Sequence, residues 1–330
     1  MKNNHLIRMI RSAVICFLIL CCLSACNRTV KKETKDQIRI VAAIFPAYDW
    51  TKNILGENPA DAELSLLLDN GVDLHSYQPS VDDILTISGC DLFIYVGGES
   101  DRWVTDALKQ AENPDRKVIR MMDVLGSAVK EEELTEGMQA EAEENDADEP
   151  EFDEHVWLSL RNAAVVCDAI AEELSQLDAV NADTYKRNAD AYKTKLAELD
   201  SAYQQAVSAG TVQTLLFGDR FPFRYLADDY GIECFAAFSG CSAETEASFE
   251  TITFLSGKID ELSLPAVLTI DGSDRRIAQT IVQNTHTKDQ KILTLDSMQS
   301  VSAQDIQNGT GYLSIMADDL EVLKQALEVR

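Results

Sequence analysis

The stretch GVDLHSYQPSVDDILTISGCDLFIYVGG, residues 71–98, decides the fold of this chain. His75 stands in a polar turn between two apolar runs typical of strands, residues 64–69 and 91–98, and an amphipathic helix pattern separates the turn from the second run. Strands that alternate with helices form parallel sheets, and open sheets of this kind bind ligands at the ends of their strands. We therefore predict an α/β fold in which His75 is the first ligand of a metal site.

The same alternation continues on both sides of this stretch. Apolar runs of strand length, separated by helix patterns, fall into two sets of four, at 38–45, 64–69, 91–98 and 117–124 and at 212–219, 232–238, 265–272 and 291–298. Each set predicts a lobe with a four-stranded, mainly parallel sheet. The N-terminal lobe should cover 38–160 and the C-terminal lobe 210–330.

Two helices should link the lobes in residues 161–209. The second, from 181 to 207, has apolar residues at alternating spacings of three and four with charges elsewhere. At about 1.5 Å per residue it would span roughly 40 Å, which is long enough to run along both lobes. The prediction is two βα lobes joined by one long backbone helix.

The first 26 residues have the pattern of a targeting segment. The basic residues Lys2, Arg8 and Arg11 precede an apolar run at 13–23, which is short for a membrane span, and the sequence Leu-Ser-Ala-Cys ends at Cys26. This order resembles a bacterial lipoprotein signal, in which Cys26 is lipidated and becomes the new N-terminus; an uncleaved anchor is the alternative. Either would hold the chain at the membrane outside the cytoplasm, with residues 27–37 as a polar tether.

The chain is strongly acidic, with a formal net charge of -27. This charge repels nucleic acid and anionic lipid surfaces, so we exclude nucleic-acid binding and expect cations as the small partner. Residues 131–154 contain thirteen acidic residues and no basic one. Self-repulsion should keep this segment from packing, either as a solvated linker or as a collector that concentrates divalent ions.

Of the eight cysteines, four lie beyond Cys26. Cys90 and Cys167 stand in apolar runs and should pack as small hydrophobic residues. Cys234 and Cys241 are seven residues apart in an oxidising compartment, so a disulfide between them is one expectation. No CxxC pair is present, which argues against a thiolate zinc site.

Further candidate ligands follow from the strand ends. His155 closes the acidic segment, and Asp219, Asp271 and Asp296 end the first, third and fourth strands of the second lobe. Two imidazoles and two carboxylates would suit a divalent first-row metal. The alternatives are that the histidines are solvated, that Asp219 caps a helix or pairs with a nearby arginine, and that Asp296 caps a turn.

Several strings together resemble a known family. They are GVDLHSYQPSVDDI with FIYVGG, then DEHVWLSLRNA, the long helix, FRYLADDYGI and LDSMQS, and they cover the chain from about residue 38. The set resembles the zinc- and manganese-binding lipoproteins of bacterial ABC importers, the cluster A-I solute-binding proteins. The resemblance implies that His75 and His155 bind the metal. Arg220 stands where relatives often have a ligand and cannot coordinate a cation, so Asp219 is expected as third ligand and Asp296 as fourth.

The resemblance implies a monomeric binding protein, not an enzyme, that captures Zn²⁺ or Mn²⁺ outside the cell and delivers it to an ABC transporter permease. Zinc is favoured by its higher intrinsic affinity, with manganese as the alternative. Proton competition at the two histidines should weaken binding below about pH 6. A secreted metallohydrolase is the competing interpretation, but neither HExxH nor GxSxG occurs. A binder of an iron chelate would need a broad aromatic or basic cleft.

Overall fold

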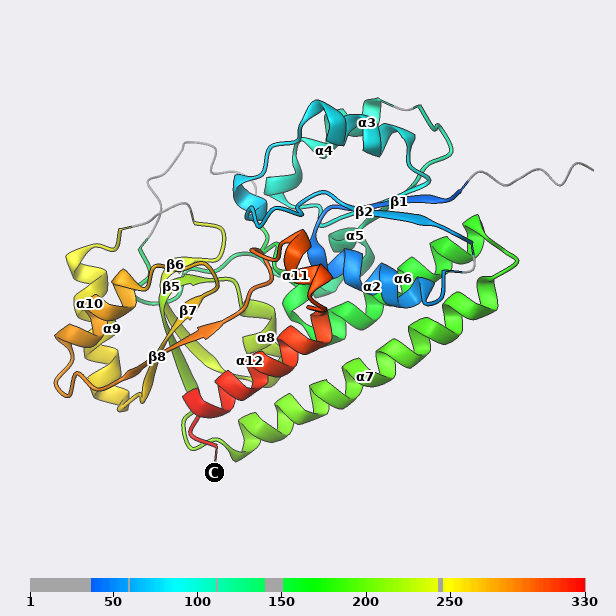
Figure 1. Ribbon diagram of the computed structural model, residues 1–330. Coiled ribbons are helices and arrows are strands. Elements are labelled where there is room, and N and C mark those ends of the chain that lie inside the picture. The colour runs from blue at the N-terminus through cyan, green and yellow to red at the C-terminus, as the bar shows by residue number, and fades with distance from the viewer. Residues whose placement is uncertain (1–36, 59, 111, 140–150, 243–245, 330) are drawn as a thin grey trace, which may run out of the picture. The chain divides into compact units, whose positions relative to one another are not determined.

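The computed structural model describes residues 37–329 apart from 59, 111, 140–150 and 243–245 (Figure 1). The expected signal segment with Cys26, the tether up to residue 36 and the middle of the acidic segment lie outside the described residues. Among the described helices, none is both long enough and apolar enough to cross a membrane.

The N-terminal lobe is built on a parallel sheet with strand order β2-β1-β3-β4. The buried central strand β1 pairs with β2 and β3 through Ile40, which lies opposite Leu64 and Leu92. Burial on both faces explains why β1 and β3 appear in the sequence as continuous apolar runs. The strands are β1 (Arg39–Ala42), β2 (Glu63–Leu66), β3 (Leu92–Tyr95) and β4 (Lys117–Arg120), with helices α2 (Phe45–Leu55), α3 (Val81–Gly89), α4 (Val104–Lys109) and α5 (Met121–Leu125).

The C-terminal lobe repeats this topology, with strand order β6-β5-β7-β8, again parallel. Its strands are β5 (Thr214–Phe221), β6 (Glu233–Ser239), β7 (Ala266–Ile270) and β8 (Lys291–Leu295), and its helices are α8 (Arg224–Tyr230), α9 (Phe249–Leu262), α10 (Arg276–Asn284) and α11 (Ala303–Gln307). Gly218 allows α10 to pack closely on β5, because a Cβ there would lie 2.6 Å from the Cα atom of Ala278. The predicted pair of four-stranded lobes is confirmed.

The predicted backbone helix is α7 (Ala182–Ala209), which follows α6 (Leu160–Leu177) as an antiparallel neighbour (Figure 1). Asn188 donates to the carbonyl oxygen of Ile54 in α2 over 2.9 Å, and the Tyr203 hydroxyl donates to that of Met316 over 2.6 Å. Met316 belongs to the final helix, α12 (Tyr312–Ala326). The long helix therefore contacts elements from both ends of the chain.

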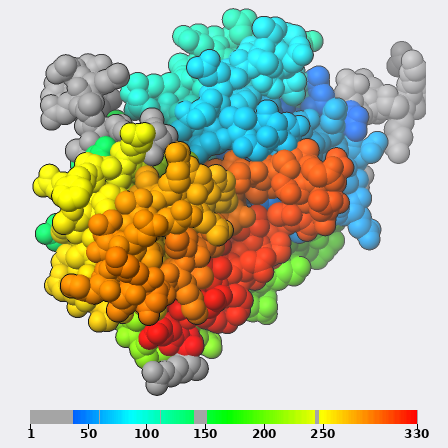
Figure 2. Space-filling view, turned by 60° about the vertical axis from the view of Figure 1, so that its left-hand side comes forward, coloured from blue at the N-terminus to red at the C-terminus, as the bar shows by residue number. Residues whose placement is uncertain are grey.

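The two lobes share one hydrophobic core. A single cluster of buried side chains runs from Ile40 in the first sheet through Trp157 and Tyr203 to Leu268 in the second, while a smaller cluster lies in the C-terminal lobe alone. The backbone of Ala303 also donates to Asp69 over 2.6 Å. Figure 2 shows the corresponding contact between the orange segment around α11 and the blue N-terminal lobe. This shared core opposes a wide hinge motion.

Candidate metal site

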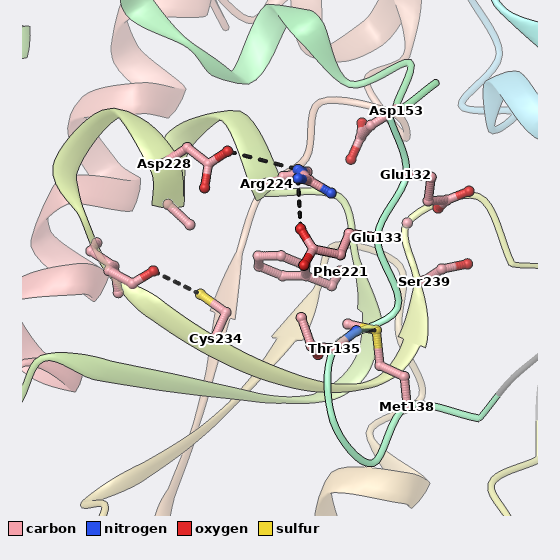
Figure 3. A pocket seen from close by; sticks show the side chains of 13 residues that line it. Glu132, Glu133, Thr135, Met138, Asp153, Phe221, Arg224, Asp228, Cys234 and Ser239 are labelled. Atoms are coloured by element: carbon pink, nitrogen blue, oxygen red, sulfur yellow. Dashed lines mark hydrogen bonds and ion pairs between the residues drawn. The ribbon is translucent and has the colours of Figure 1, made fainter. Parts of the chain in front are cut away.

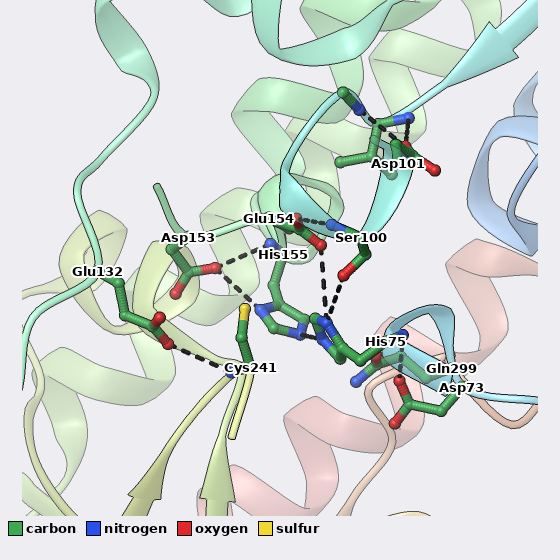
Figure 4. A network of polar contacts seen from close by, with 12 residues as sticks. Asp73, His75, Ser100, Asp101, Glu132, Asp153, Glu154, His155, Cys241 and Gln299 are labelled. Carbon is green, nitrogen blue, oxygen red and sulfur yellow. Dashed lines mark hydrogen bonds and ion pairs between the residues drawn. The ribbon is translucent and has the colours of Figure 1, made fainter. Parts of the chain in front are cut away.

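Two short 3-10 helices present the histidines. His75 lies in η1 (Leu74–Ser76), where the Asp73 carboxylate caps the turn by accepting from the His75 backbone N–H over 2.9 Å. His155 immediately precedes η4 (Val156–Leu158), and its backbone N–H donates to Asp153 over 2.8 Å. The structure brings these distant residues together, with 3.2 Å between their Nε2 atoms (Figure 4).

Each ring is also held through its other nitrogen. The His155 Nδ1 atom lies 2.9 Å from Asp153, and the His75 Nδ1 atom lies 2.8 Å from the Ser100 hydroxyl. Ser100 belongs to the loop that contains η2 (Glu99–Asp101) and donates its backbone N–H to Glu154 over 2.7 Å. Such partners orient metal-ligating imidazoles and leave Nε2 free to bind the ion.

The glycines of the string FIYVGG make room for this arrangement. A Cβ at Gly98 would lie 2.2 Å from the Glu154 carboxylate, so a larger residue would displace Glu154. One oxygen of Glu154 is bonded to Ser100, while Oε2 is buried without a hydrogen bond and lies 3.7 Å from His75 Nδ1. The sequence motif therefore shapes the support of the histidine pair.

The two imidazoles differ in their electrostatics. Burial lowers the pKa of His75 to about 3, and the positive charge on a protonated His155 adds to that effect. His155 is fully buried, which lowers its pKa, but the carboxylates of Asp153, Glu154 and Glu132 together outweigh that burial and raise the pKa of His155 above its ordinary value. Without a cation, one proton on His155 and a neutral His75 is the favoured state, because both rings cannot be charged at this separation.

A third residue faces the pair. The side chains of His75, His155 and Cys241 offer ligand atoms that all lie within 4.8 Å of one another, the only such group of three found in the described part of the chain. Cys241 follows strand β6, and its backbone N–H donates to Glu132 over 3.2 Å. The preceding Gly240 lies against the imidazole, since a Cβ there would be 3.0 Å from His155 Cε1.

The expected disulfide between Cys234 and Cys241 is wrong, because both are free cysteines. Cys234 is the second residue of β6, and Cys241 comes after the strand has ended. At about 3.3 Å per residue, the strand alone separates Cys234 from Ser239 by roughly 16 Å, whereas disulfides need Cα atoms within about 7 Å. The thiol of Cys234 instead contacts the carbonyl oxygen of Ile232.

The structure does not bring Asp219 to the histidines. The register of β5 against β6 shifts between Phe217 and Arg220, which changes the direction of the side chains that follow. Asp219 accepts from the Arg220 backbone over 2.9 Å, and Arg220 reaches across to Asp73 over 2.6 Å. Asp219 lines a separate polar cavity of about 260 Å³ with Asp73 and Asp271.

Asp296 is also engaged elsewhere. Its carboxylate accepts from the Met298 backbone N–H over 2.7 Å, and its own N–H donates to Asp319 over 2.8 Å. Burial and the neighbouring Asp271 carboxylate raise the pKa of Asp296 to about 6. Asp271 in turn accepts from the Ser297 backbone and hydroxyl. These aspartates close turns after their strands and do not join the histidine group.

The two ends of the acidic segment are more ordered than we expected. Glu132 donates its backbone N–H to Glu151 over 2.8 Å, and Gln139 donates to Ala237 of β6 over 3.0 Å. Backbone pairing thus holds these ends despite their charge. Figure 3 shows a cavity of about 100 Å³ beside them, where Arg224 contacts Glu133 and Asp228. The contacts of Ser100, Glu132, Asp153 and Glu154 with the site were not predicted from the sequence, although Asp153 and Glu154 stand beside His155 in the motif.

Two parallel-sheet lobes with a buried and a half-buried imidazole and a thiol converging between them are what a metal-binding protein of the two-lobed solute-binding class requires. The family model described as "Zinc-uptake complex component A periplasmic" (ZnuA) matches residues 40–326. The chain therefore belongs to the ZnuA family, whose members are metal-binding components of uptake systems outside the cytoplasm and not enzymes.

Individual relatives agree with this assignment. The zinc-binding lipoprotein AdcA of Streptococcus pneumoniae strain R6 is 28% identical over 94% of this chain, which spans only 60% of that protein. The high-affinity zinc uptake system protein ZnuA of Bacillus subtilis is 26% identical, with 96% of each chain covered. The crystal structure of the Zn(II)-bound ZnuA-like domain of Streptococcus pneumoniae AdcA superposes with a TM-score of 0.68 at 26% identity, covering 88% of this chain and 99% of that domain.

Proposed function

We propose that this chain is the solute-binding protein of a zinc importer, which captures Zn²⁺ between its lobes and delivers it to an ABC transporter permease. The observation that carries the proposal is the histidine pair, with 3.2 Å between the Nε2 atoms and each Nδ1 held by a partner. Two nitrogens bound tetrahedrally to zinc at 2.0–2.1 Å are about 3.3 Å apart. The pair is therefore already spaced for one shared ion.

Zinc fits the site better than manganese. Zinc exceeds manganese in affinity for nitrogen ligands, while manganese favours carboxylate and water oxygens. The two carboxylates that would have suited manganese, Asp219 and Asp296, do not join the histidine group among the described residues, although Oδ2 of Asp219 is buried without a hydrogen bond. The names of the relatives, zinc-binding lipoprotein AdcA and zinc uptake protein ZnuA, agree with this choice. Manganese is the alternative cargo.

The membrane association and the assembly state belong to the same proposal. Lipidation at Cys26 would hold the protein at the outer face of the cell membrane, close to its permease, and AdcA is named a lipoprotein. A monomer suits a carrier that must dock on the permease through its own lobes. Because the lobes share one core, we expect only small movements on zinc binding, which solution scattering with and without zinc can test.

The experiment that tests the function is calorimetric titration of the chelator-stripped chain, purified in detergent, with Zn²⁺ and with Mn²⁺. His75→Ala should weaken zinc binding by more than about 100-fold, since the loss of a ligand exceeds the effect of losing one of its partners. The matched control is His286→Ala, because His286 is an exposed histidine that pairs only with Asp260 among the contacts found. If zinc binds equally well to His75→Ala, the proposed function fails.

A further inference from the structure

We propose that Cys241 is the third metal ligand and that its thiolate makes the site selective for zinc over manganese. This inference rests on the proposed function, because it concerns the same ion. It departs from the ligand set expected from the sequence, in which the C-terminal lobe provides two ligands, Asp219 and Asp296. His75, His155 and Cys241 form the one such group among the residues that the structure describes, and their ligand atoms lie within 4.8 Å of one another.

The distances permit one ion to reach all three atoms. With a zinc–sulfur bond of 2.3 Å and zinc–nitrogen bonds of 2.0–2.1 Å, tetrahedral geometry requires about 3.6 Å between sulfur and nitrogen. The separations found are at most 4.8 Å, so the thiol needs to move by only about 1 Å. A rotation of the Cys241 side chain can supply such a shift without moving the backbone.

The backbone around Cys241 is fixed in the position that this role requires. Gly240 packs on the His155 ring, and the Cys241 N–H is bonded to Glu132. The turn after β6 is therefore held from both sides, by the ligand ring on one and by the acidic segment on the other. Figure 4 shows the thiol pointing from this turn toward the imidazoles.

A second observation marks the space between these residues as a ligand site. His155 is fully buried, and its Nε2 atom lies 3.2 Å from Nε2 of His75, whose Nδ1 atom is held by Ser100. The nearby Glu154 Oε2 is buried without a hydrogen bond. Several carboxylates close to a buried donor group lower the cost of placing a divalent cation there. Burial and Glu132 raise the pKa of the Cys241 thiol, so the thiolate forms only when the ion displaces its proton to solvent.

A thiolate at this position has two consequences. Soft sulfur ligands favour zinc strongly over manganese, so Cys241 would set the selectivity that the two histidines leave open. The histidines come from the N-terminal lobe and Cys241 from the C-terminal lobe, so the bound ion would join the two lobes. When zinc is bound, Asp271 and Asp296 of the C-terminal lobe would then keep their hydrogen bonds to Ser297 and Met298.

The test compares Cys241→Ser with Cys234→Ser, which removes a buried thiol from the other end of the same strand. Co²⁺ is used as a spectroscopic substitute for zinc, because a cobalt–thiolate bond gives an intense near-ultraviolet charge-transfer band. We expect the band in the wild-type chain and in Cys234→Ser, and its loss in Cys241→Ser. Zinc affinity should fall at least about 10-fold in Cys241→Ser, with much less effect on manganese.

The outcomes separate this inference from the proposed function. If the wild type lacks the band, or if Cys241→Ser binds zinc normally while Asp219→Asn or Asp296→Asn does not, carboxylates are the ligands and zinc capture itself stands. If His75→Ala binds zinc normally, the function fails regardless of Cys241. Should Cys241→Ser fold poorly by circular dichroism, zinc protection of Cys241 from alkylation in the wild-type chain, read by mass spectrometry, decides the matter; equal labelling with and without zinc overturns the inference.

Discussion

The two lobes have the same strand order but use the ends of their strands differently. In the N-terminal lobe the loops after β2 and β3 hold His75 and its partner Ser100, which bonds Nδ1, while the Nε2 atom of His75 faces only the Nε2 atom of His155 among the contacts of the described residues. In the C-terminal lobe the carboxylates after β7 and β8 accept hydrogen bonds from nearby backbone N–H groups. We infer that a polar residue at a strand end is available as a ligand only when neighbouring groups do not already use its lone pairs.

The comparison between the lobes is tested most strongly by replacing one proposed histidine ligand of the N-terminal lobe and one hydrogen-bonded aspartate of the C-terminal lobe. His155→Ala should weaken zinc binding by more than about 100-fold, because it removes a ligand, whereas Asp296→Asn should change it by less than about 3-fold. Asparagine can still accept from the Met298 backbone, so the turn is preserved. Zinc titration of both variants measures the contrast. Equal losses in the two variants would show that the C-terminal aspartate is also a ligand.

Removing a partner of a ligand should have an intermediate effect. Asp153→Asn keeps the size of the side chain but removes the charge that supports His155, 2.9 Å away. Partners of this kind contribute about 10- to 100-fold to metal affinity. Competition with a chelator of known zinc affinity measures the change. The matched control is Asp168→Asn, an exposed carboxylate that pairs with Lys193 on the linking helices; a similar loss there would point to a general effect of charge.

The sequence predicted the scaffold better than the second half of the site. Buried parallel strands appear as apolar runs, and both histidines stand in short motifs, so these features are visible locally. Asp219 does not lie with the histidines in the structure: it stands at the register shift in β5, and the next residue, Arg220, pairs with Asp73. Nothing near Cys241 in the sequence indicates that the fold places its thiol beside His155, 86 positions away by residue number.

The disulfide expectation failed for a related reason. Seven residues can close a disulfide when they form a loop, but here most of them form β6, which holds Cys234 and Cys241 apart. The absence of CxxC excluded only a site made of two local thiolates. A single cysteine combined with distant histidines leaves no spacing pattern, so it becomes visible only once the sheets are assembled.

The pH dependence should report the unequal basicity of the two imidazoles. Because the pKa of His155 is raised, zinc must displace a proton from it at pH values below that pKa, and affinity should fall about 10-fold more per pH unit there. His75, with its pKa lowered to about 3, adds no such step in the physiological range. Zinc titrations from about pH 8 to about pH 5 measure the slope.

The sign of this effect can be checked with a variant. Asp153→Asn removes the carboxylate that raises the pKa of His155, so the steeper region should move to lower pH. The same proton stabilises the metal-free fold in acid, and that contribution is lost as pH rises through the raised pKa. A wild-type slope that steepens in two separate steps between about pH 8 and pH 5 would mean that both histidines titrate there, contrary to the assignment.

The smallest effect is expected at the ion pair between Arg220 and Asp73, which joins the C-terminal lobe to the N-terminal lobe. Arg220 donates to Asp73 over 2.6 Å, and both side chains are about one-fifth exposed, at 21% and 23%. Arg220→Gln should lower the free energy of unfolding by about 1–2 kcal/mol, as for other hydrogen bonds between charged groups. Denaturant unfolding of the metal-free chain measures this loss.

The same variant should bind zinc slightly more tightly, by a few-fold at most. The positive charge of Arg220 contributes to the lowered pKa of His75, so it also opposes a cation at the neighbouring Nε2 atom. Lys258→Gln, distant in the C-terminal lobe, is a control for loss of one positive charge. A large loss of zinc binding in Arg220→Gln alone would mean that the Arg220–Asp73 pair positions His75, and the C-terminal lobe would then shape the histidine site through this contact as well as through Cys241.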